Sequence, residues 1–250
     1  MTVHLVGAGP GDPQLLTQRG TALLTVAEHV VYDRPSMAEI LALAPGAVQH
    51  CVGKQGATPA LPQQEINSLL IALGRTGACV VRLKSGDPFV VSRGGEEAMA
   101  LANAGVAVDV VPGVSAAVAA AAAAGIPVMV RKRARTLTVV AGNDDIDEVD
   151  WDAVARLGGT VVLLTGRAAL HRVIAALRAG GMAPDTPVAA ISAATRPQQR
   201  TVRGTLARPP SARLPAPLTV VIGEVAALDV TASAVGGRCA VRSPERWGGS

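Results

Sequence analysis

Aromatic side chains are nearly absent from this 250-residue sequence, which contains two tryptophans, one tyrosine and one phenylalanine. Proteins that bind single-stranded nucleic acid stack bases on aromatic side chains along a strongly basic groove. A net charge of +4 with so few aromatics provides no such surface. We therefore expect no nucleic acid partner, and an acidic small molecule fits the modest positive charge better.

Long hydrophobic runs are missing as well. Although 49% of the residues are hydrophobic, no run reaches the roughly 18 to 20 residues that span a bilayer. The nearest candidate, Ala116 to Ala124, is short and mostly alanine. The N-terminus has no basic segment followed by an apolar segment and a cleavage site. These absences predict no export signal, no membrane partner and a cytoplasmic location.

Cysteine and histidine are too scarce and too scattered for a metal site. Cys51, Cys79 and Cys239 are an odd number without metal-type spacing, and two of them lie in apolar runs, which predicts small buried hydrophobic side chains. The four histidines are dispersed along the chain. We therefore expect no metal ion.

Apolar runs typical of buried strands alternate with helical patterns in the first part of the chain. The stretch after Pro62 has Ile66, Leu69, Leu70 and Leu73 at the spacing of one helix face. Strands are predicted at 3–6, 29–32, 48–52, 79–83 and 108–111. This alternation predicts a mostly parallel sheet with helices on its faces.

Pro112-Gly113 interrupts the alternation and is the predicted domain boundary. An alanine-rich helix is expected from Ser115, followed by strands at 137–140, 160–164, 187–191 and 218–222, with a further, antiparallel strand at 201–205. The chain is therefore predicted to form two α/β domains, residues 1–112 and 113–228. Residues 229–250 are small or polar and are expected to be a disordered tail.

Two loops carry the same Gly-Asp-Pro letters, one at Gly11 and one at Gly86. Each follows a predicted strand, and in open α/β sheets the loops after the strands line the ligand crevice. We expect both loops to face one small-molecule pocket. In the first loop, Asp12 fits a helix N-cap and Pro13 the first helical position.

The first of these loops also imitates a dinucleotide-binding fingerprint. Gly7-x-Gly9-x-Gly11 follows a strand, and Asp33 ends the next strand, where such an acid would hold a ribose hydroxyl. Asp12, however, stands where the final glycine is expected. Nicotinamide binding and a merely structural tight turn are both open on this pattern.

A longer series of motifs resembles the tetrapyrrole methylase family, and within it the uroporphyrinogen III C-methyltransferases. The motifs follow the family's order over residues 3–228 and begin with Val6-Gly-Ala-Gly-Pro-Gly-Asp-Pro and Tyr32-Asp-Arg. The others are Val52-Gly-Lys, Pro62-Gln-Gln-Glu-Ile-Asn, Val81-Arg-Leu-Lys-Ser-Gly-Asp-Pro-Phe, Arg93-Gly-Gly-Glu-Glu, Val111-Pro-Gly-Val-Ser and Gly125-Ile-Pro.

The resemblance implies a homodimer of two α/β domains with S-adenosyl-L-methionine in the cleft between them. It implies methylation of uroporphyrinogen III at C2 and C7 to precorrin-2, for cobalamin- or siroheme-type biosynthesis. The residues that it implies as cofactor contacts are Pro10, Ser85, Gly86, Asp87, Ser115, Ala116, Thr165, Ala194 and Gly223. Because the cofactor has no phosphate, the glycine loop would serve close backbone approach.

The resemblance also implies Asp33 as the catalytic acid–base residue and Lys54 as its partner in proton transfer. Alternatively, Asp33 caps a turn and Lys54 is a solvated surface lysine. A substrate with eight carboxylates needs cations, and those predicted to bind it are Arg34, Arg93 and Arg131. Arg82 and Lys84 share one strand face, which is either part of this site or simply solvated.

The chain departs from the family pattern mainly in its second half. Leu164-Thr165-Gly166 replaces a typical Tyr-Met-Gly, and Ser192-Ala-Ala-Thr replaces Glu-x-Gly-Thr. In the first half, Ser85 replaces a glycine. These changes leave two other hypotheses open: a methyltransferase of the same fold that acts on another substrate, and a non-catalytic S-adenosylmethionine-binding protein.

Overall fold

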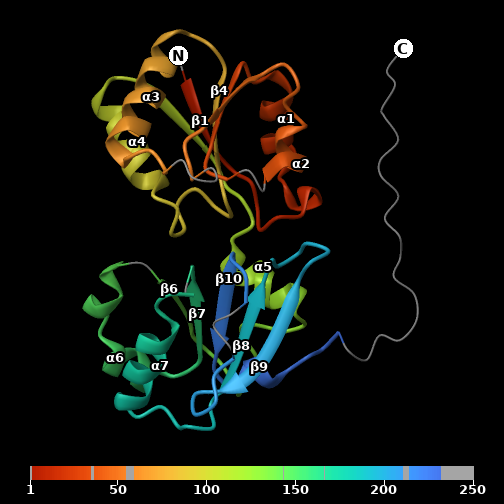
Figure 1. Cartoon of the computed structure of the whole chain (residues 1–250), viewed down its shortest axis with the longest axis vertical. Coiled ribbons are helices and arrows are strands. Elements are labelled where there is room, and N and C mark those ends of the chain that lie inside the picture. Colours follow the sequence, from red (N-terminus) through yellow and green to blue (C-terminus); the bar gives the residue numbers. More distant parts are fainter. Residues whose placement is uncertain are drawn as a thin grey trace.

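The computed structural model describes residues 2–34, 37–54, 59–142, 144–165, 167–210 and 214–231. They form a mixed α/β fold of two lobes, one above the other in Figure 1, and each lobe contains one five-stranded sheet. Of the predicted tail 229–250, all but the first three residues lie outside the described residues, and so does Cys239.

The N-terminal lobe has a fully parallel sheet, as the sequence predicts. Its strands are β1 (Thr2–Gly7), β2 (His29–Tyr32), β3 (Val48–Cys51), β4 (Val80–Lys84) and β5 (Ala107–Val111). They lie in the order β3-β2-β4-β1-β5, and every neighbouring pair is parallel. The helices are α1 (Gln18–Val26), α2 (Ala38–Leu41), α3 (Gln63–Arg75) and α4 (Gly94–Asn103). Two apolar clusters, one on each face, bury the sheet beneath these helices.

The segment after β1 forms a short 3-10 turn and then a separate helix, rather than one continuous helix. Asp12 and Pro13 hold their predicted places at the start of the turn, η1 (Pro13–Leu15), where the Asp12 carboxylate accepts from the Gln14 amide at 2.9 Å. Leu16 is extended and ends the turn. Helix α1 then begins after Thr17, whose hydroxyl accepts from the Gly20 amide and so provides a second cap.

The C-terminal lobe has a mixed and mostly antiparallel sheet. Its strands are β6 (Leu137–Ala141), β7 (Thr160–Leu164), β8 (Pro187–Ser192), β9 (Arg200–Thr205) and β10 (Leu218–Ile222). In the order β6-β7-β10-β8-β9 only β6 and β7 are parallel. The helices are α5 (Ala116–Ala123), α6 (Trp151–Leu157) and α7 (Leu170–Ala179), with 3-10 turns η3 (Asp144–Glu148) and η4 (Glu224–Ala227). The predicted antiparallel strand at 201–205 is confirmed as β9.

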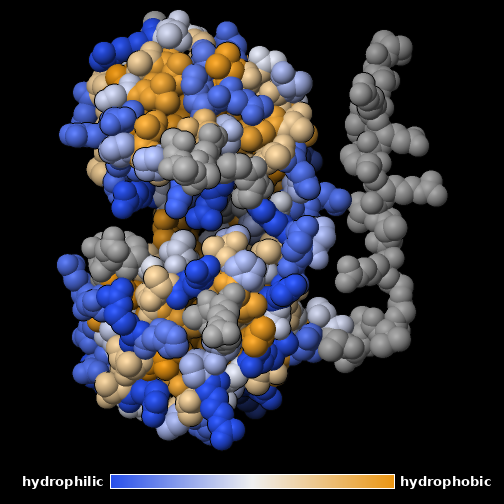
Figure 2. Space-filling model, in the orientation of Figure 1, coloured by the Kyte–Doolittle hydropathy of each residue, from blue (hydrophilic) through white to orange (hydrophobic). Residues whose placement is uncertain are grey.

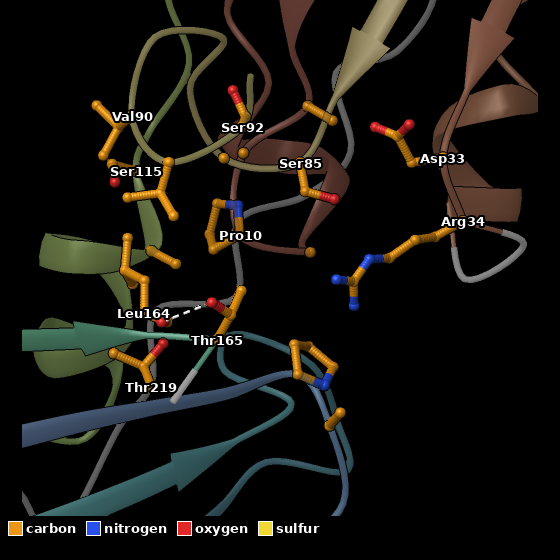
Figure 3. Close-up of a pocket in the computed structure, with 18 of the residues that line it drawn as sticks. Pro10, Asp33, Arg34, Ser85, Val90, Ser92, Ser115, Leu164, Thr165 and Thr219 are labelled. Carbon is orange, nitrogen blue, oxygen red and sulfur yellow. Dashed lines mark hydrogen bonds between the residues drawn. The ribbon is translucent and has the colours of Figure 1, made fainter. Parts of the chain in front are cut away.

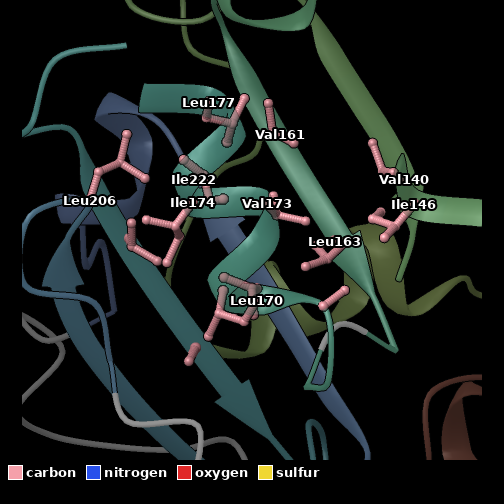
Figure 4. Packing of buried hydrophobic residues seen from close by; sticks show 14 of the residues in the cluster. Val140, Ile146, Val161, Leu163, Leu170, Val173, Ile174, Leu177, Leu206 and Ile222 are labelled. Atoms are coloured by element: carbon pink, nitrogen blue, oxygen red, sulfur yellow. The ribbon is translucent and has the colours of Figure 1, made fainter. Parts of the chain in front are cut away.

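Helices cover both faces of the second sheet, which explains its unbroken apolar strands. On one face, Leu170, Val173 and Leu177 of α7 pack against Val161 and Leu163 of β7 (Figure 4). On the other face, the alanines of α5 bury their small side chains against β7 and β10. Every residue of β7 and β10 is buried, so neither strand shows the alternation of a half-solvated strand.

The two described cysteines differ from their prediction. Cys51 and Cys79 are only half-buried, because Cys51 ends the edge strand β3 and Cys79 precedes β4 at the surface. In the described part of the chain, no helix has the length and apolar character needed to cross a bilayer. Figure 2 shows the molecular surface hollowed between the two lobes.

Candidate functional site

A pocket of about 380 Å³ lies between the lobes and is lined by residues of both (Figure 3). The N-terminal lobe contributes the loops after β1, β2 and β4, and the C-terminal lobe contributes the end of β7 and the start of β10. Ser115 and Ala116, at the start of α5, lie on one wall. A volume of this size is typical of small-molecule sites.

The backbone of two glycine loops forms the part of the wall nearest β1 and β4. Gly9 donates to the Gly86 carbonyl at 3.1 Å, and Gly86 donates back to the Gly9 carbonyl at 2.8 Å. Both Gly-Asp-Pro loops therefore face one pocket, as predicted. Gly113 packs beneath them, where a Cβ would lie 2.3 Å from the Gly86 carbonyl oxygen. Glycine is required at this position because the neighbouring atoms are backbone.

Asp87 lies outside the pocket and stabilises the glycine loop after β4 by hydrogen bonds. One carboxylate oxygen accepts from the Phe89 amide at 2.8 Å, and the other accepts from the Gly113 amide at 3.0 Å. The loop after β4 is thus tied both to itself and to the segment that leads into the second lobe. Asp87 does not line the pocket, but its carboxylate fixes the backbone that does.

Asp33 faces the pocket and belongs to a buried cluster of four charged side chains. Arg82 Nη2 donates to Asp33 Oδ1 at 2.6 Å and to Glu97 Oε1 at 2.8 Å. Lys84 Nζ lies 2.8 Å from Glu97 Oε1 and 3.9 Å from Asp33 Oδ2. Glu97 is completely buried, whereas the side chain of Asp33 keeps 30% exposure.

Two cations and two carboxylates make this cluster electrically balanced. Burial alone would lower the pKa of Arg82, but the carboxylates of Asp33 and Glu97 outweigh it and raise that pKa. Burial and the neighbouring Arg82 lower the pKa of Lys84, against the opposing effect of the two carboxylates. Arg82 and Lys84 are therefore buried ion-pair partners. The alternative left open by the sequence, that their strand face is exposed to solvent, is wrong.

The structure brings most of the predicted site residues to the pocket. Those that line it are Pro10, Asp33, Arg34, Ser85, Gly86, Ser115, Ala116 and Thr165. Thr165 has a positive φ of 55°, and its hydroxyl donates to the Leu164 carbonyl at 2.7 Å, the bond drawn in Figure 3.

Other predicted residues lie away from the lining. Lys54, Arg93 and Arg131 are exposed, and Ala194 packs in the apolar cluster around α5. Gly223 follows the last residue of β10. Because β10 runs antiparallel to β7, its start lines the pocket and its end points away. Gly223 is therefore about 13 Å along the strand from the pocket residue Thr219.

Sequence reasoning missed two arginines of the lining, Arg167 and Arg196. Each follows the end of a predicted strand, β7 for Arg167 and β8 for Arg196, and that position was the available signal. The start of β10, with Leu218 and Thr219, was also missed because a continuous apolar run does not reveal the direction of a strand.

Comparisons with known proteins agree on one family. The model of the Tetrapyrrole (Corrin/Porphyrin) Methylases matches residues 2–210. The chain is 42% identical over 232 residues to the S-adenosyl-L-methionine-dependent uroporphyrinogen III methyltransferase of Methanosarcina barkeri, covering 89% of this chain and 91% of that protein. It is 44% identical over 228 residues to siroheme synthase 1 of Yersinia enterocolitica, covering 89% of this chain and 48% of that protein. The chain thus spans about half the length of the siroheme synthases that it matches.

Solved structures give the same result. The uroporphyrin-III C-methyl transferase of Thermus thermophilus, complexed with S-adenyl homocysteine, superimposes with a TM-score of 0.77 and 36% identity. The match covers 90% of this chain and 98% of that one. The motif order, the two-lobed fold and these matches together show that the chain belongs to the tetrapyrrole methylase family.

Proposed function

We propose that this protein is an S-adenosyl-L-methionine-dependent methyltransferase that methylates uroporphyrinogen III at C2 and C7, giving precorrin-2. The observation that carries the proposal is a carboxylate, Asp33, held at the edge of a pocket whose wall is glycine backbone. Two relatives support it: the Methanosarcina barkeri protein is named an S-adenosyl-L-methionine-dependent uroporphyrinogen III methyltransferase, and the Thermus thermophilus C-methyl transferase is complexed with S-adenyl homocysteine.

The chemistry of the lining fits the proposed cofactor. Val90 and Leu164 provide apolar surface for an adenine ring, and Ser85 and Ser115 provide hydroxyl groups beside the backbone of Gly86. We propose that Pro10, Ser85, Gly86, Ser115, Ala116 and Thr165 contact the cofactor directly. Asp87 would act through the loop that it fastens, and Ala194 through the packing around α5.

The bound cofactor supplies an electrophilic methyl group, so the protein needs mainly to position the acceptor carbon and to handle one proton. Positioning at near-attack distance lowers the barrier by removing translational and rotational freedom. Asp33 would accept the proton that the tetrapyrrole macrocycle must lose after it is methylated. Arg82, at 2.6 Å from Oδ1, holds this carboxylate in one orientation.

Two lysines lie near Asp33, one buried and one exposed. Lys84 Nζ is 3.9 Å from Asp33 Oδ2 and buried. Lys54 is exposed, and the preceding residue, Gly53, packs against the Asp33 carbonyl so closely that a Cβ would lie 1.6 Å from the oxygen. We retain Lys54 as the proposed proton-transfer partner because it is reachable from solvent.

The charge of the lining favours an anionic acceptor. Among the residues that the structure describes, three arginines, Arg34, Arg167 and Arg196, line the pocket with a single acid, Asp33. Arginine makes strong, charge-assisted hydrogen bonds to carboxylates, of which uroporphyrinogen III has eight. Arg93 and Arg131, on the surface, remain proposed contacts for its outer carboxylates. The proposal also includes the homodimer and the cytoplasmic location expected from the sequence.

The test is incubation of the purified protein with isotope-labelled S-adenosylmethionine and uroporphyrinogen III, followed by mass spectrometry of the tetrapyrrole. We expect products with one and then two added methyl groups, formed about 100- to 10,000-fold more slowly by the Asp33→Asn variant. Tight binding of S-adenosylhomocysteine without transfer would contradict the proposed acceptor. Absence of binding would contradict the proposed cofactor. Light scattering tests the dimer.

A further inference from the structure

Arg196 reaches the pocket from the C-terminal lobe with a side chain that has no partner among the described residues. Its Nε atom is buried and forms no hydrogen bond, although the residue lines the pocket. A buried donor without an acceptor costs free energy. Such a cost is removed when a ligand supplies the acceptor, so this atom marks a position where a ligand group binds.

The backbone that carries Arg196 is fixed by hydrogen bonds to the first glycine loop and to the end of α5. The Thr195 hydroxyl accepts from the Asp12 amide at 3.1 Å, across the two lobes. The Thr195 amide donates to the Gln199 side chain at 2.8 Å, and Gln199 in turn donates to the Ala123 carbonyl at the end of α5. The Arg196 amide closes a turn by donating to the Ala193 carbonyl at 3.2 Å.

The Arg196 side chain occupies space next to Gly11 that is free only because Gly11 has no side chain. A Cβ on Gly11 would lie 2.3 Å from Arg196 Nε and 3.0 Å from its Cγ. Gly11 also has a φ of 149°, which side chains rarely adopt. The guanidinium therefore rests against the backbone of the Gly11 loop, beside Pro10 on the pocket wall.

We propose that Arg196 is a carboxylate-binding residue of the interlobe pocket, donating charge-assisted hydrogen bonds to an acid group of the ligand that binds there. The inference rests on the proposed function, which brings two sources of carboxylate into one pocket. These are the amino-acid part of the cofactor and the acidic side chains of the tetrapyrrole. Both offer the planar pair of oxygens that a guanidinium matches.

The experiment compares Arg196→Gln and Arg196→Lys with the matched control Arg200→Gln, an exposed arginine at the start of β9. Calorimetry measures binding of S-adenosylhomocysteine and of 5′-methylthioadenosine, which has the same nucleoside but no carboxylate. Steady-state assays measure KM for uroporphyrinogen III. Melting temperature verifies that each variant is folded, and Arg196→Lys, which keeps the charge, should be the milder change.

A cofactor contact predicts that Arg196→Gln weakens S-adenosylhomocysteine binding about 10- to 100-fold, the range for a hydrogen bond to a charged group, and leaves 5′-methylthioadenosine unchanged. A substrate contact predicts unchanged binding of both and a KM for uroporphyrinogen III raised by a similar factor. Equal weakening of both nucleosides, or wild-type values for all three constants, would overturn the inference. If the wild-type protein itself bound no S-adenosylhomocysteine, the proposed function would fail, and this inference with it.

Discussion

Arg82 donates to Asp33 over 2.6 Å while the same Nη2 atom donates to Glu97 over 2.8 Å. One guanidinium thus connects a carboxylate at the pocket with a carboxylate that solvent never reaches. Without Glu97, Arg82 and Lys84 would be two buried cations with a single, partly exposed counter-charge. The orientation of Asp33 therefore depends on a residue of α4 that has no contact with the pocket.

Asp33→Asn should slow methyl transfer without loss of cofactor affinity. The amide keeps the shape of the carboxylate but cannot take up a proton, so turnover is expected to fall about 100- to 10,000-fold. Binding of S-adenosylhomocysteine, measured by calorimetry, should stay near the wild-type value. Turnover equal to that of the wild type would show that Asp33 has no part in proton transfer.

Glu97→Gln should destabilise the protein more than any exposed glutamate substitution on the same helix. It removes one partner of a completely buried ion pair, a change that typically costs about 3–5 kcal/mol of unfolding free energy. Its neighbour Glu96 is exposed, and Glu96→Gln should stay within about 0.5 kcal/mol of the wild type. Urea denaturation measures both. Equal stability of the two variants would contradict a structural role for the buried cluster.

Asp87→Ala should weaken cofactor binding although Asp87 does not line the pocket. The change removes acceptors for the Phe89 and Gly113 amides and so loosens the backbone that carries Gly86. Loss of about 1.4 kcal/mol corresponds to a tenfold weaker Kd for S-adenosylhomocysteine. Asp185→Ala, at an exposed turn, is the control. A Kd like that of the control would indicate that the loop keeps its shape without Asp87.

His50 should make the protein less stable in mild acid. Burial and the neighbouring His29, whose Nδ1 lies 3.1 Å from His50 Nε2, lower the pKa of His50. The unfolded chain, with a pKa near 6.5, then binds the proton more readily than the folded chain. Stability therefore decreases as the pH falls through about 6.5 towards the lower pKa of the folded state.

Melting curves between about pH 8 and pH 5.5 measure this effect. His50→Gln should lose less stability over this interval than the wild type, whereas His171→Gln, at an exposed position of α7, should follow the wild type. Identical slopes for His50→Gln and the wild type would exclude His50 as the source of the acid sensitivity.

The sequence predicts the first lobe better than the second for a physical reason. In a parallel sheet every strand ends at the same edge, so residues after strands, such as Asp33 and Ser85, can be assigned to one site from their positions alone. In the second lobe β10 runs in the opposite direction. The apolar run Leu218 to Ile222 contains no sign of its direction, so the sequence could not show that Gly223 follows the end of β10 that points away from the pocket.

The sequence also does not predict which charged side chains are buried. Period-two alternation places Arg82 and Lys84 on one face but cannot say whether water or Glu97 meets them, because Glu97 is on a helix 15 residues away. Arg196 was missed for a related reason. Its place beside Gly11 depends on a contact between the two lobes, made by residues 185 positions apart in sequence, which no local pattern encodes.

The paired amides of Gly9 and Gly86 have a consequence for how this scaffold can change. A wall made of peptide groups keeps its pattern of donors and acceptors whichever side chains surround it. Substitutions of lining residues from the second lobe, such as Arg167, would alter which acceptor enters while the peptide wall stays the same. New acceptor specificity could therefore be selected in a library confined to the second lobe, with the glycine loops left untouched.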